Sequence, residues 1–271
     1  MLLREVEYAR PSSVDEAVAL LGAHEGARAL AGGQTLLNVM KARAASPDVL
    51  VDLNRLHELR EISISGETLR IGAMATYTQL MASSEVDVSR PILAEVAAQI
   101  ADVQVRNRGT IGGNACSNDP TNHLPPLLVA LGASFEIRGA GGERTVNAED
   151  FFLGVYMTAV GEGDLLLSIS VPAAAKAADG FASITIGRDG TCIANAAASL
   201  TDGETRIALG CVDAVPVLLT PAASDEQSVR EAVAAAALDP PSDVHAPSEY
   251  RRHLTEICAV RAVAQAAERG A

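Results

Sequence analysis

The sequence predicts an α+β fold in three parts, because three patterns follow one another along its 271 residues. The first part alternates short apolar segments with helical ones, and the second adds a hairpin, helices and a long stretch rich in Gly, Asn and Pro. The third combines the strands of an antiparallel sheet with two helices. A chain of this length fits two or three packed units, since domains usually have about 100–200 residues. The changes of pattern place the parts at residues 1–55, 56–175 and 176–271.

The first part reads as a β-α-β-α-β unit. Ser12 and Ser13 offer an N-cap to a helix whose first turn is acidic and which ends at Gly22. A second, brief helix is expected at 36–43, and strands are expected at residues 5–8, 27–31 and 49–53. Together these elements make one compact unit.

A hairpin opens the second part, with strand-like segments at 62–64 and 68–71 on either side of a Ser-Gly-Glu turn. Residues 107–126 are predicted to be irregular, and a loop of that length inside a compact domain is usually functional. Around it we expect helices at 78–81 and 91–101 and strands at 134–138, 145–146 and 165–171.

The third part is predicted to begin after a linker at residues 172–176. Its strands should form an antiparallel sheet, accompanied by two helices near the end of the chain. The strands are expected at 181–186, 193–200 and 206–210, and the helices at 226–236 and 248–268.

Composition excludes several classes of protein. The formal net charge of −13 repels phosphate backbones, which argues against binding to nucleic acid or to an anionic membrane. The four cysteines are scattered without metal-ligand spacing, the N-terminus lacks the apolar core of a signal peptide, and no apolar run is long enough to span a membrane. We therefore expect a cytoplasmic protein without a metal. With no Trp and only four Phe and four Tyr, the chain has few rings to stack on a planar cofactor.

Two diglycine segments are the most informative features. The first, Ala31-Gly32-Gly33-Gln34-Thr35, lies between a predicted strand and a short helix, and the second, Thr110-Ile111-Gly112-Gly113-Asn114, lies within the long irregular stretch. Adjacent glycines let an anion approach the backbone, and successive amide N–H groups can then converge on phosphate oxygens. The pair is thus typical of a site that holds a pyrophosphate from two sides.

Either segment alone is more often a tight turn than a binding site. Neither matches the Gly-x-Gly-x-x-Gly dinucleotide fingerprint or the Gly-x-x-x-x-Gly-Lys-Ser/Thr phosphate loop. The indication of a dinucleotide site therefore depends on the two segments together and on the residues around them.

With their surroundings, the two segments resemble a known family. Residues 30–37 with Met40-Lys41, and residues 106–120, look like the FAD-binding medium subunits of molybdenum hydroxylases. This family includes carbon monoxide dehydrogenase, xanthine dehydrogenase and the nicotine and caffeine dehydrogenases. The resemblance extends from residues 8–11 to residues 247–252, and the two motifs occur in the family's order and spacing, which makes it specific.

The resemblance implies a fold of the vanillyl-alcohol-oxidase (PCMH) type, with FAD between the first two parts and the third closing over it. The diphosphate would lie against both diglycine segments, Ile100 would line the adenine side, and Ser117 and His123 would face the ribityl-phosphate region. Leu166 would approach the flavin ring, and because the chain has few aromatic rings, aliphatic groups such as Leu166 and Ile193 should flank the flavin. It implies no catalytic or metal-binding residue. The cofactor-binding residues are then Ala31, Gly32, Gly33, Gln34, Thr35, Ile100, Thr110, Ile111, Gly112, Gly113, Asn114, Ser117, His123 and Leu166.

The sequence departs from the family pattern at three positions. His123 replaces an Asp, and a pKa near neutrality would let it carry a pH-dependent charge beside a phosphate. Thr185 replaces a Lys and Cys192 an Asp near the flavin, while Arg188 is retained. Loss of a cation there argues against NAD as the electron acceptor. An isolated Cys with apolar neighbours, such as Cys192, is usually a small core residue rather than a redox group.

The role implied by the resemblance is that of an electron-transfer subunit. FAD on this chain would take electrons from [2Fe-2S] clusters of a small partner subunit and pass them to quinone, cytochrome or oxygen in preference to NAD. A large molybdopterin subunit would carry the substrate site, and the complex would be a heterohexamer, a dimer of heterotrimers. Two alternatives remain open at this point, a free-standing FAD oxidase of the same fold and a non-catalytic nucleotide-diphosphate-binding protein.

Overall fold

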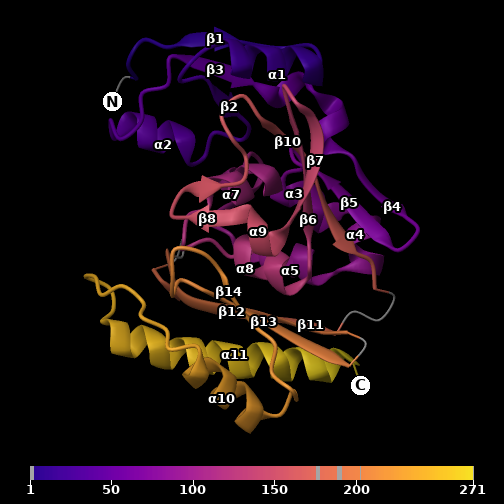
Figure 1. Cartoon of the computed structure of the whole chain (residues 1–271), viewed down its shortest axis with the longest axis vertical. Coiled ribbons are helices and arrows are strands. Elements are labelled where there is room, and N and C mark those ends of the chain that lie inside the picture. Colours follow the sequence, from indigo (N-terminus) through magenta and orange to yellow (C-terminus); the bar gives the residue numbers. More distant parts are fainter. Residues whose placement is uncertain (1–2, 175–177, 188–190, 202, 271) are drawn as a thin grey trace.

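The computed structural model describes residues 3–174, 178–187, 191–201 and 203–270. It confirms the predicted α+β fold, whose three parts follow one another from top to bottom in Figure 1. Each part has its own cluster of buried apolar side chains. Residues 175 and 176 of the expected linker, and Arg188, lie outside the described residues.

The first part is the predicted β-α-β-α-β unit. Its strands β1 (Glu7–Ala9), β2 (Arg28–Leu30) and β3 (Val49–Asp52) form a parallel sheet in the order β1-β3-β2. Helix α1 (Val14–Ala23) is capped by Ser13, whose hydroxyl accepts the N–H of Glu16, and α2 (Leu36–Lys41) follows β2. Two short 3-10 helices, η1 (Leu53–Arg55) and η2 (His57–Arg60), lead into the second part.

The second part is built on a five-stranded antiparallel sheet. Its order is β4 (Ile62–Ser65), β5 (Thr68–Gly72), β10 (Leu165–Pro172), β6 (Ser134–Gly139) and β7 (Gly142–Asn147). Phe135, Phe151 and Phe152 stack in its core, so three of the four Phe residues of the chain pack on one another and not on a ligand. A two-stranded hairpin, β8 (Phe152–Gly154) and β9 (Met157–Thr158), projects from this part.

Seven helices pack around this sheet, and two of them correct the sequence analysis. They are α3 (Tyr77–Ala82), α4 (Ser84–Ser89), α5 (Ile92–Gln99), α6 (Val103–Arg106), α7 (Ile111–Ser117), α8 (Leu124–Ala130) and α9 (Ala148–Phe151). The stretch 107–126, expected to be irregular, contains all of α7 and the start of α8. Helix α7 forms despite its two glycines because Thr110 caps it, and it ends where Asn118 takes a left-handed φ of 38°.

The third part is a four-stranded antiparallel sheet between two helical layers. The strands β11 (Asp179–Ile186), β12 (Thr191–Thr201), β13 (Glu204–Gly210) and β14 (Val217–Leu219) lie between α8 on one side and α10 (Glu226–Ala235) and α11 (Ser248–Gly270) on the other (Figure 1). Small residues allow this close packing. A Cβ on Gly180 would lie 1.9 Å from the Ala262 carbonyl oxygen, and Ala196, Ala197 and Ala198 of β12 are fully buried.

Candidate functional site

The two diglycine segments lie directly against each other. A Cβ added at Gly32 would come within 2.1 Å of the carbonyl oxygen of Arg108, and one added at Gly113 would lie 3.6 Å from the Cβ of Ala31. Real Cβ contacts essentially never fall below 3.0 Å, so only glycine lets the backbone at Gly32 approach Arg108, just before the second segment, this closely. The structure therefore brings together two segments that are far apart in the sequence.

The first segment is a turn between β2 and α2. Gly33 has a left-handed φ of 73°, which favours glycine, and the side chain of Gln34 donates to the carbonyl oxygen of Gly32 at 3.1 Å. Thr35 precedes α2, and its side chain makes no capping hydrogen bond. Gly32 is buried, whereas Thr35 is exposed. The Gln34 side chain thus stabilises the turn, and the N-terminus of α2 has no side-chain cap.

The second segment is the first turn of α7, and its amides already have acceptors. Ile111 and Gly112 donate to the carbonyl oxygens of Ala75 and Ala73, each at 3.0 Å, and Gly113 donates to the hydroxyl of Thr110 at 3.0 Å. The expectation that successive amides of this segment converge on a phosphate is therefore wrong.

Close packing explains the glycines of α7 instead. A Cβ on Gly112 would lie 2.6 Å from the Cβ of Ala73, and Gly113 is exposed at the surface of the helix. A ligand would approach this turn over the bare backbone of Gly113.

Two buried polar atoms near α7 have no hydrogen-bond partner among the described residues. They are Oδ1 of Asn114, on the second turn of α7, and Nε2 of His123, which immediately precedes α8. Buried polar groups are normally paired, so each such atom needs an explanation, and a ligand atom is one. The side chain of Asn122, beside His123, donates to the carbonyl oxygen of Asn114 at 3.4 Å, which connects the two regions.

His123 is a neutral residue in this structure. It is 5% exposed, and its ring centroid lies 5.6 Å from that of Phe181 on β11. Burial lowers the pKa of its imidazole from 6.5 to about 4, because the charged form loses its hydration. The expectation of a pH-dependent charge near neutrality at this position is therefore wrong.

The remaining predicted residues are less accessible. Leu166 is 3% exposed on β10, within the same apolar core as Ile111 and Ala115 of α7. Ile100 packs against this core after α5, and its carbonyl oxygen accepts a hydrogen bond from Arg106 at 3.0 Å. Ser117 is the half-buried last residue of α7.

In the third part, Thr185 is exposed and is the register partner of Cys192 on the neighbouring strand. Cys192 is fully buried, as predicted for a core residue, but its sulfur contacts the polar side chain of Asn195 as well as apolar neighbours. Ile193 is buried in the core of the third part, so the expectation of Ile193 beside a cofactor has no support from its position.

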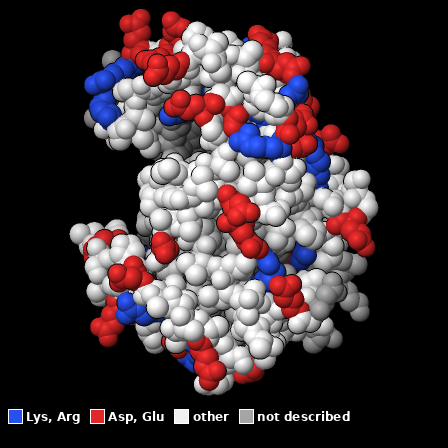
Figure 2. Space-filling model, in the orientation of Figure 1, with Lys and Arg blue, Asp and Glu red and all other residues white. Residues whose placement is uncertain are grey.

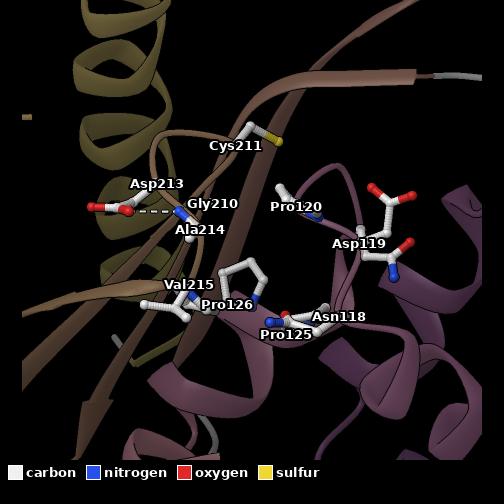
Figure 3. A pocket seen from close by; sticks show the side chains of 12 residues that line it. Asn118, Asp119, Pro120, Pro125, Pro126, Gly210, Cys211, Asp213, Ala214 and Val215 are labelled. Carbon is white, nitrogen blue, oxygen red and sulfur yellow. Dashed lines mark hydrogen bonds between the residues drawn. The ribbon is translucent and has the colours of Figure 1, made fainter. Parts of the chain in front are cut away.

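The molecular surface is hollowed next to these segments. Figure 2 shows a hollow between the lobe that carries α2 and the part that carries α7 and β8. A separate, smaller cavity of about 10 Å³ lies between the α7–α8 loop and residues 210–216 (Figure 3). The sequence analysis did not single out Asn118, Gly210 or Cys211, which line this cavity, because their conformations depend on tertiary contacts.

Other kinds of site are not found in the described residues. No group of three or more His, Cys, Asp or Glu side chains is placed to hold a metal ion there. None of the helices described has the length and apolar character needed to cross a membrane.

Comparison with known proteins gives a consistent result. Residues 4–174 match the family model described as FAD binding domain in molybdopterin dehydrogenase. The chain is 49% identical over 177 residues to the carbon monoxide dehydrogenase medium chain of Hydrogenophaga pseudoflava, covering 65% of this chain and 62% of that one. It is 31% identical to the nicotine 6-hydroxylase medium subunit of Paenarthrobacter nicotinovorans, over 99% of this chain and 100% of the other. A chain in the structure of reconstituted CO dehydrogenase from Oligotropha carboxidovorans superposes with a TM-score of 0.94 at 36% identity, covering 99% and 100% of the two chains.

Proposed function

The chain belongs to the family of FAD-binding domains of molybdopterin dehydrogenases, and we propose that it is the FAD-carrying electron-transfer subunit of a molybdenum hydroxylase complex. It receives electrons from the iron–sulfur clusters of a small partner subunit, while a large subunit with molybdopterin holds the organic substrate. The complex is a cytoplasmic dimer of heterotrimers. The observation that carries the proposal is the contact between the two diglycine segments at the edge of the hollow.

The residues present fit a dinucleotide. Gly33 and Gly113 present backbone without a Cβ, and Thr35 makes no side-chain cap at the start of α2, so a diphosphate would lie against these two turns. The unpaired Oδ1 of Asn114 is an acceptor for a ligand hydroxyl, and the neutral imidazole of His123 offers its unpaired Nε2 to the ribityl-phosphate region. Ser117, Ile100 and Leu166 complete the proposed set, the last two as apolar contacts.

The chain's own contribution is binding and orientation. Bound FAD would supply the redox chemistry, because a flavin exchanges one or two electrons, and the protein sets its position and electrostatic surroundings. Gln34 holds the first turn through the carbonyl oxygen of Gly32, and Thr110 holds the first turn of α7. No side chain of this chain acts as a general acid or base.

The acceptor is proposed to be quinone, cytochrome or oxygen rather than NAD. Thr185 is exposed and uncharged where family members have a cation, so the third part offers less attraction for an anionic nicotinamide dinucleotide. Anaerobic reduction of the purified protein, followed by mixing with NAD, a quinone or oxygen, tests this. Reoxidation by NAD as fast as by the others would contradict it.

An exposed apolar hairpin supports a role as a subunit. Leu153, Val155, Tyr156 and Met157, on and between β8 and β9, are 48–61% exposed, and Figure 2 shows a largely uncharged surface over β8. Contiguous apolar surface of this kind usually marks a protein interface. Asn118 fixes the hairpin, because its side chain donates to the carbonyl oxygens of Gly154 at 2.7 Å and Met157 at 3.3 Å.

The first experiment is an absorption spectrum of the purified chain, before and after addition of FAD and removal of the excess. Flavin absorption bands at a 1:1 ratio are expected, and their absence after FAD addition would overturn the proposal in favour of a colourless diphosphate binder. Co-purification with a molybdopterin subunit and an iron–sulfur subunit tests the complex. Full substrate oxidation by the isolated chain would instead indicate a free-standing oxidase.

A further inference from the structure

Two cysteines of the third part share one hydrogen-bond donor. Nδ2 of Asn195 lies 3.3 Å from Sγ of Cys192 and 3.5 Å from Sγ of Cys211. Cys192 lies near the start of β12, and Cys211 directly follows Gly210, the register partner of Asn195 on β13. The two sulfur atoms therefore lie beside the same side-chain nitrogen, although 18 residues separate them in the sequence.

Two irregularities of the sheet produce this arrangement. The register of β11 and β12 shifts between Ile184 and Thr185, so the regular alternation of side chains is broken at Cys192. Cys211 has a left-handed φ of 66°, which a non-glycine residue rarely adopts, and it ends β13. Regular strands would not keep both sulfurs beside Asn195.

The surroundings distinguish this pair from the other two cysteines. Cys211 lines the small cavity between the third part and the α7–α8 loop, and in Figure 3 its sulfur points toward the side where Pro120 and Asp119 lie. A hydrogen bond from the Cys211 thiol lowers the pKa of Cys192, and the same bond raises that of Cys211. Burial raises the pKa of Cys116 to about 12, and burial together with the neighbouring Cys192 raises that of Cys258 to about 12. Thiolate character, on which nucleophilic reactivity depends, is thus concentrated on Cys192.

We propose that Cys192 and Cys211 form a redox-active dithiol that hydrogen peroxide converts to a disulfide. The Cys192 thiolate attacks one oxygen of the peroxide, so that an S–O bond forms, the O–O bond breaks and hydroxide leaves. Cys211 gives its proton to that hydroxide, and its sulfur displaces a second hydroxide from Cys192, which takes a proton from solvent. Two thiols lose two electrons, one peroxide becomes two waters, and a dithiol reductant reverses the change.

The pair is placed to affect the contact between the second and third parts. Nδ2 of Asn195 also donates to the carbonyl oxygen of Asn122 at 3.3 Å, next to His123 on the α7–α8 loop. Closing the disulfide changes the position of both sulfurs around Asn195 and therefore the geometry of this hydrogen bond. The dithiol is thus connected through Asn195 and Asn122 to His123 of the proposed cofactor site. Oxidation of the two thiols does not require bound cofactor.

The test is a thiol count on the full-length purified protein. The protein is reduced, freed of reductant under nitrogen, treated with one equivalent of hydrogen peroxide, alkylated after denaturation and weighed by mass spectrometry. Of the four thiols, two are expected to be lost, a peptide pair joining Cys192 and Cys211 is expected, and dithiothreitol should restore all four thiols. Retention of four thiols, or a link between other cysteines, would overturn the proposal.

Matched variants separate the pair from general oxidation. Cys192→Ala should keep its three remaining thiols under the same treatment. Cys211→Ala should lose only the Cys192 thiol, to an S–O product without a disulfide, whereas Cys258→Ala should lose two of its three. Disulfide formation that persists in Cys192→Ala or Cys211→Ala would contradict the assignment. If a variant fails to fold, the peptide map of the unmodified chain still shows whether Cys192 is joined to Cys211.

Discussion

Gly32 packs against Arg108 so closely that a methyl group on its Cα would lie 2.1 Å from the Arg108 carbonyl oxygen. The contact joins the turn after β2 to the residue pair that precedes Thr110 and α7. Because the backbone of the β2–α2 turn packs directly on the backbone that precedes α7, a shift of one of them requires a shift of the other. The contact between Gly32 and Arg108 thus holds the two diglycine segments of the proposed FAD site next to each other.

Gly32→Ala should therefore damage both stability and flavin retention. Inserting a methyl group into a packed contact typically costs about 1–3 kcal/mol, and here the obstacle is backbone, which cannot rotate away. Urea denaturation and the ratio of FAD to protein after gel filtration measure the two effects.

Gly22→Ala is the matched control for that substitution. A Cβ at Gly22 meets nothing within 4 Å, and the residue lies inside α1, so the change should stabilise the protein by up to about 1 kcal/mol. Equal stability and equal FAD content in the two variants would refute this role of the contact between Gly32 and Arg108.

His123 should make the protein less stable as the pH falls from 6.5 toward 4. Its pKa is about 4 in the folded state and 6.5 unfolded, so within this range the unfolded state binds more protons and gains free energy relative to the folded state. The full effect, below pH 4, is about 3 kcal/mol. Denaturation of the FAD-free protein at pH 7, 6, 5 and 4.5 should show a smaller loss for His123→Gln than for the unmodified chain. His253→Gln, at an exposed position, is the matched substitution for comparison.

The buried pair of Arg90 and Asp179 links the second and third parts. Nη1 of Arg90 lies 2.8 Å from Oδ1 of Asp179, both side chains are at most 3% exposed, and Ser199 donates to the same carboxylate at 2.7 Å. Arg90→Met should cost about 3–5 kcal/mol, because it leaves the Asp179 carboxylate buried without its cation.

An exposed ion pair gives the comparison for Arg90. Arg230 is 39% exposed and pairs with Glu226 one turn away on α10 and with Glu256 on α11, so Arg230→Met should cost about 1 kcal/mol or less. Adding Asp179→Leu to Arg90→Met should recover part of the lost stability. A loss for Arg90→Met as small as that for Arg230→Met would show that the pair does not hold the two parts together.

Local pattern predicted much of this fold, because capping and alternation are properties of neighbouring residues. Ser13 caps α1 as expected, and the β-α-β-α-β unit follows from its sequence. Helix α7 escaped prediction because its glycines have low helix propensity, while the contacts that favour it, to Ala73 and Ala75, are more than thirty residues away in the chain.

The chemistry of the site was harder to predict for the same reason. The lowered pKa of His123 results from burial beside Phe181, 58 residues later. The pairing of Cys192 with Cys211 depends on a register shift and a left-handed residue, neither of which has a signature in the sequence. Residue types could thus indicate a dinucleotide site, but protonation and thiol pairing required the tertiary structure.

The apolar hairpin between β8 and β9 should be needed for assembly with the partner subunits. Leu153 and Met157 are 58% and 60% exposed, and replacing both with Ser removes apolar area that a partner would cover. Truncating well-buried interface side chains commonly costs about 1–2 kcal/mol each, so the double variant should bind its partners about 30-fold to nearly 1,000-fold more weakly, with FAD content unchanged. Co-expression followed by size-exclusion chromatography measures the fraction assembled. Val244 is 95% exposed and isolated from the hairpin in sequence, so Val244→Ser should assemble normally. Undiminished assembly of the double variant would place the interface elsewhere on the chain.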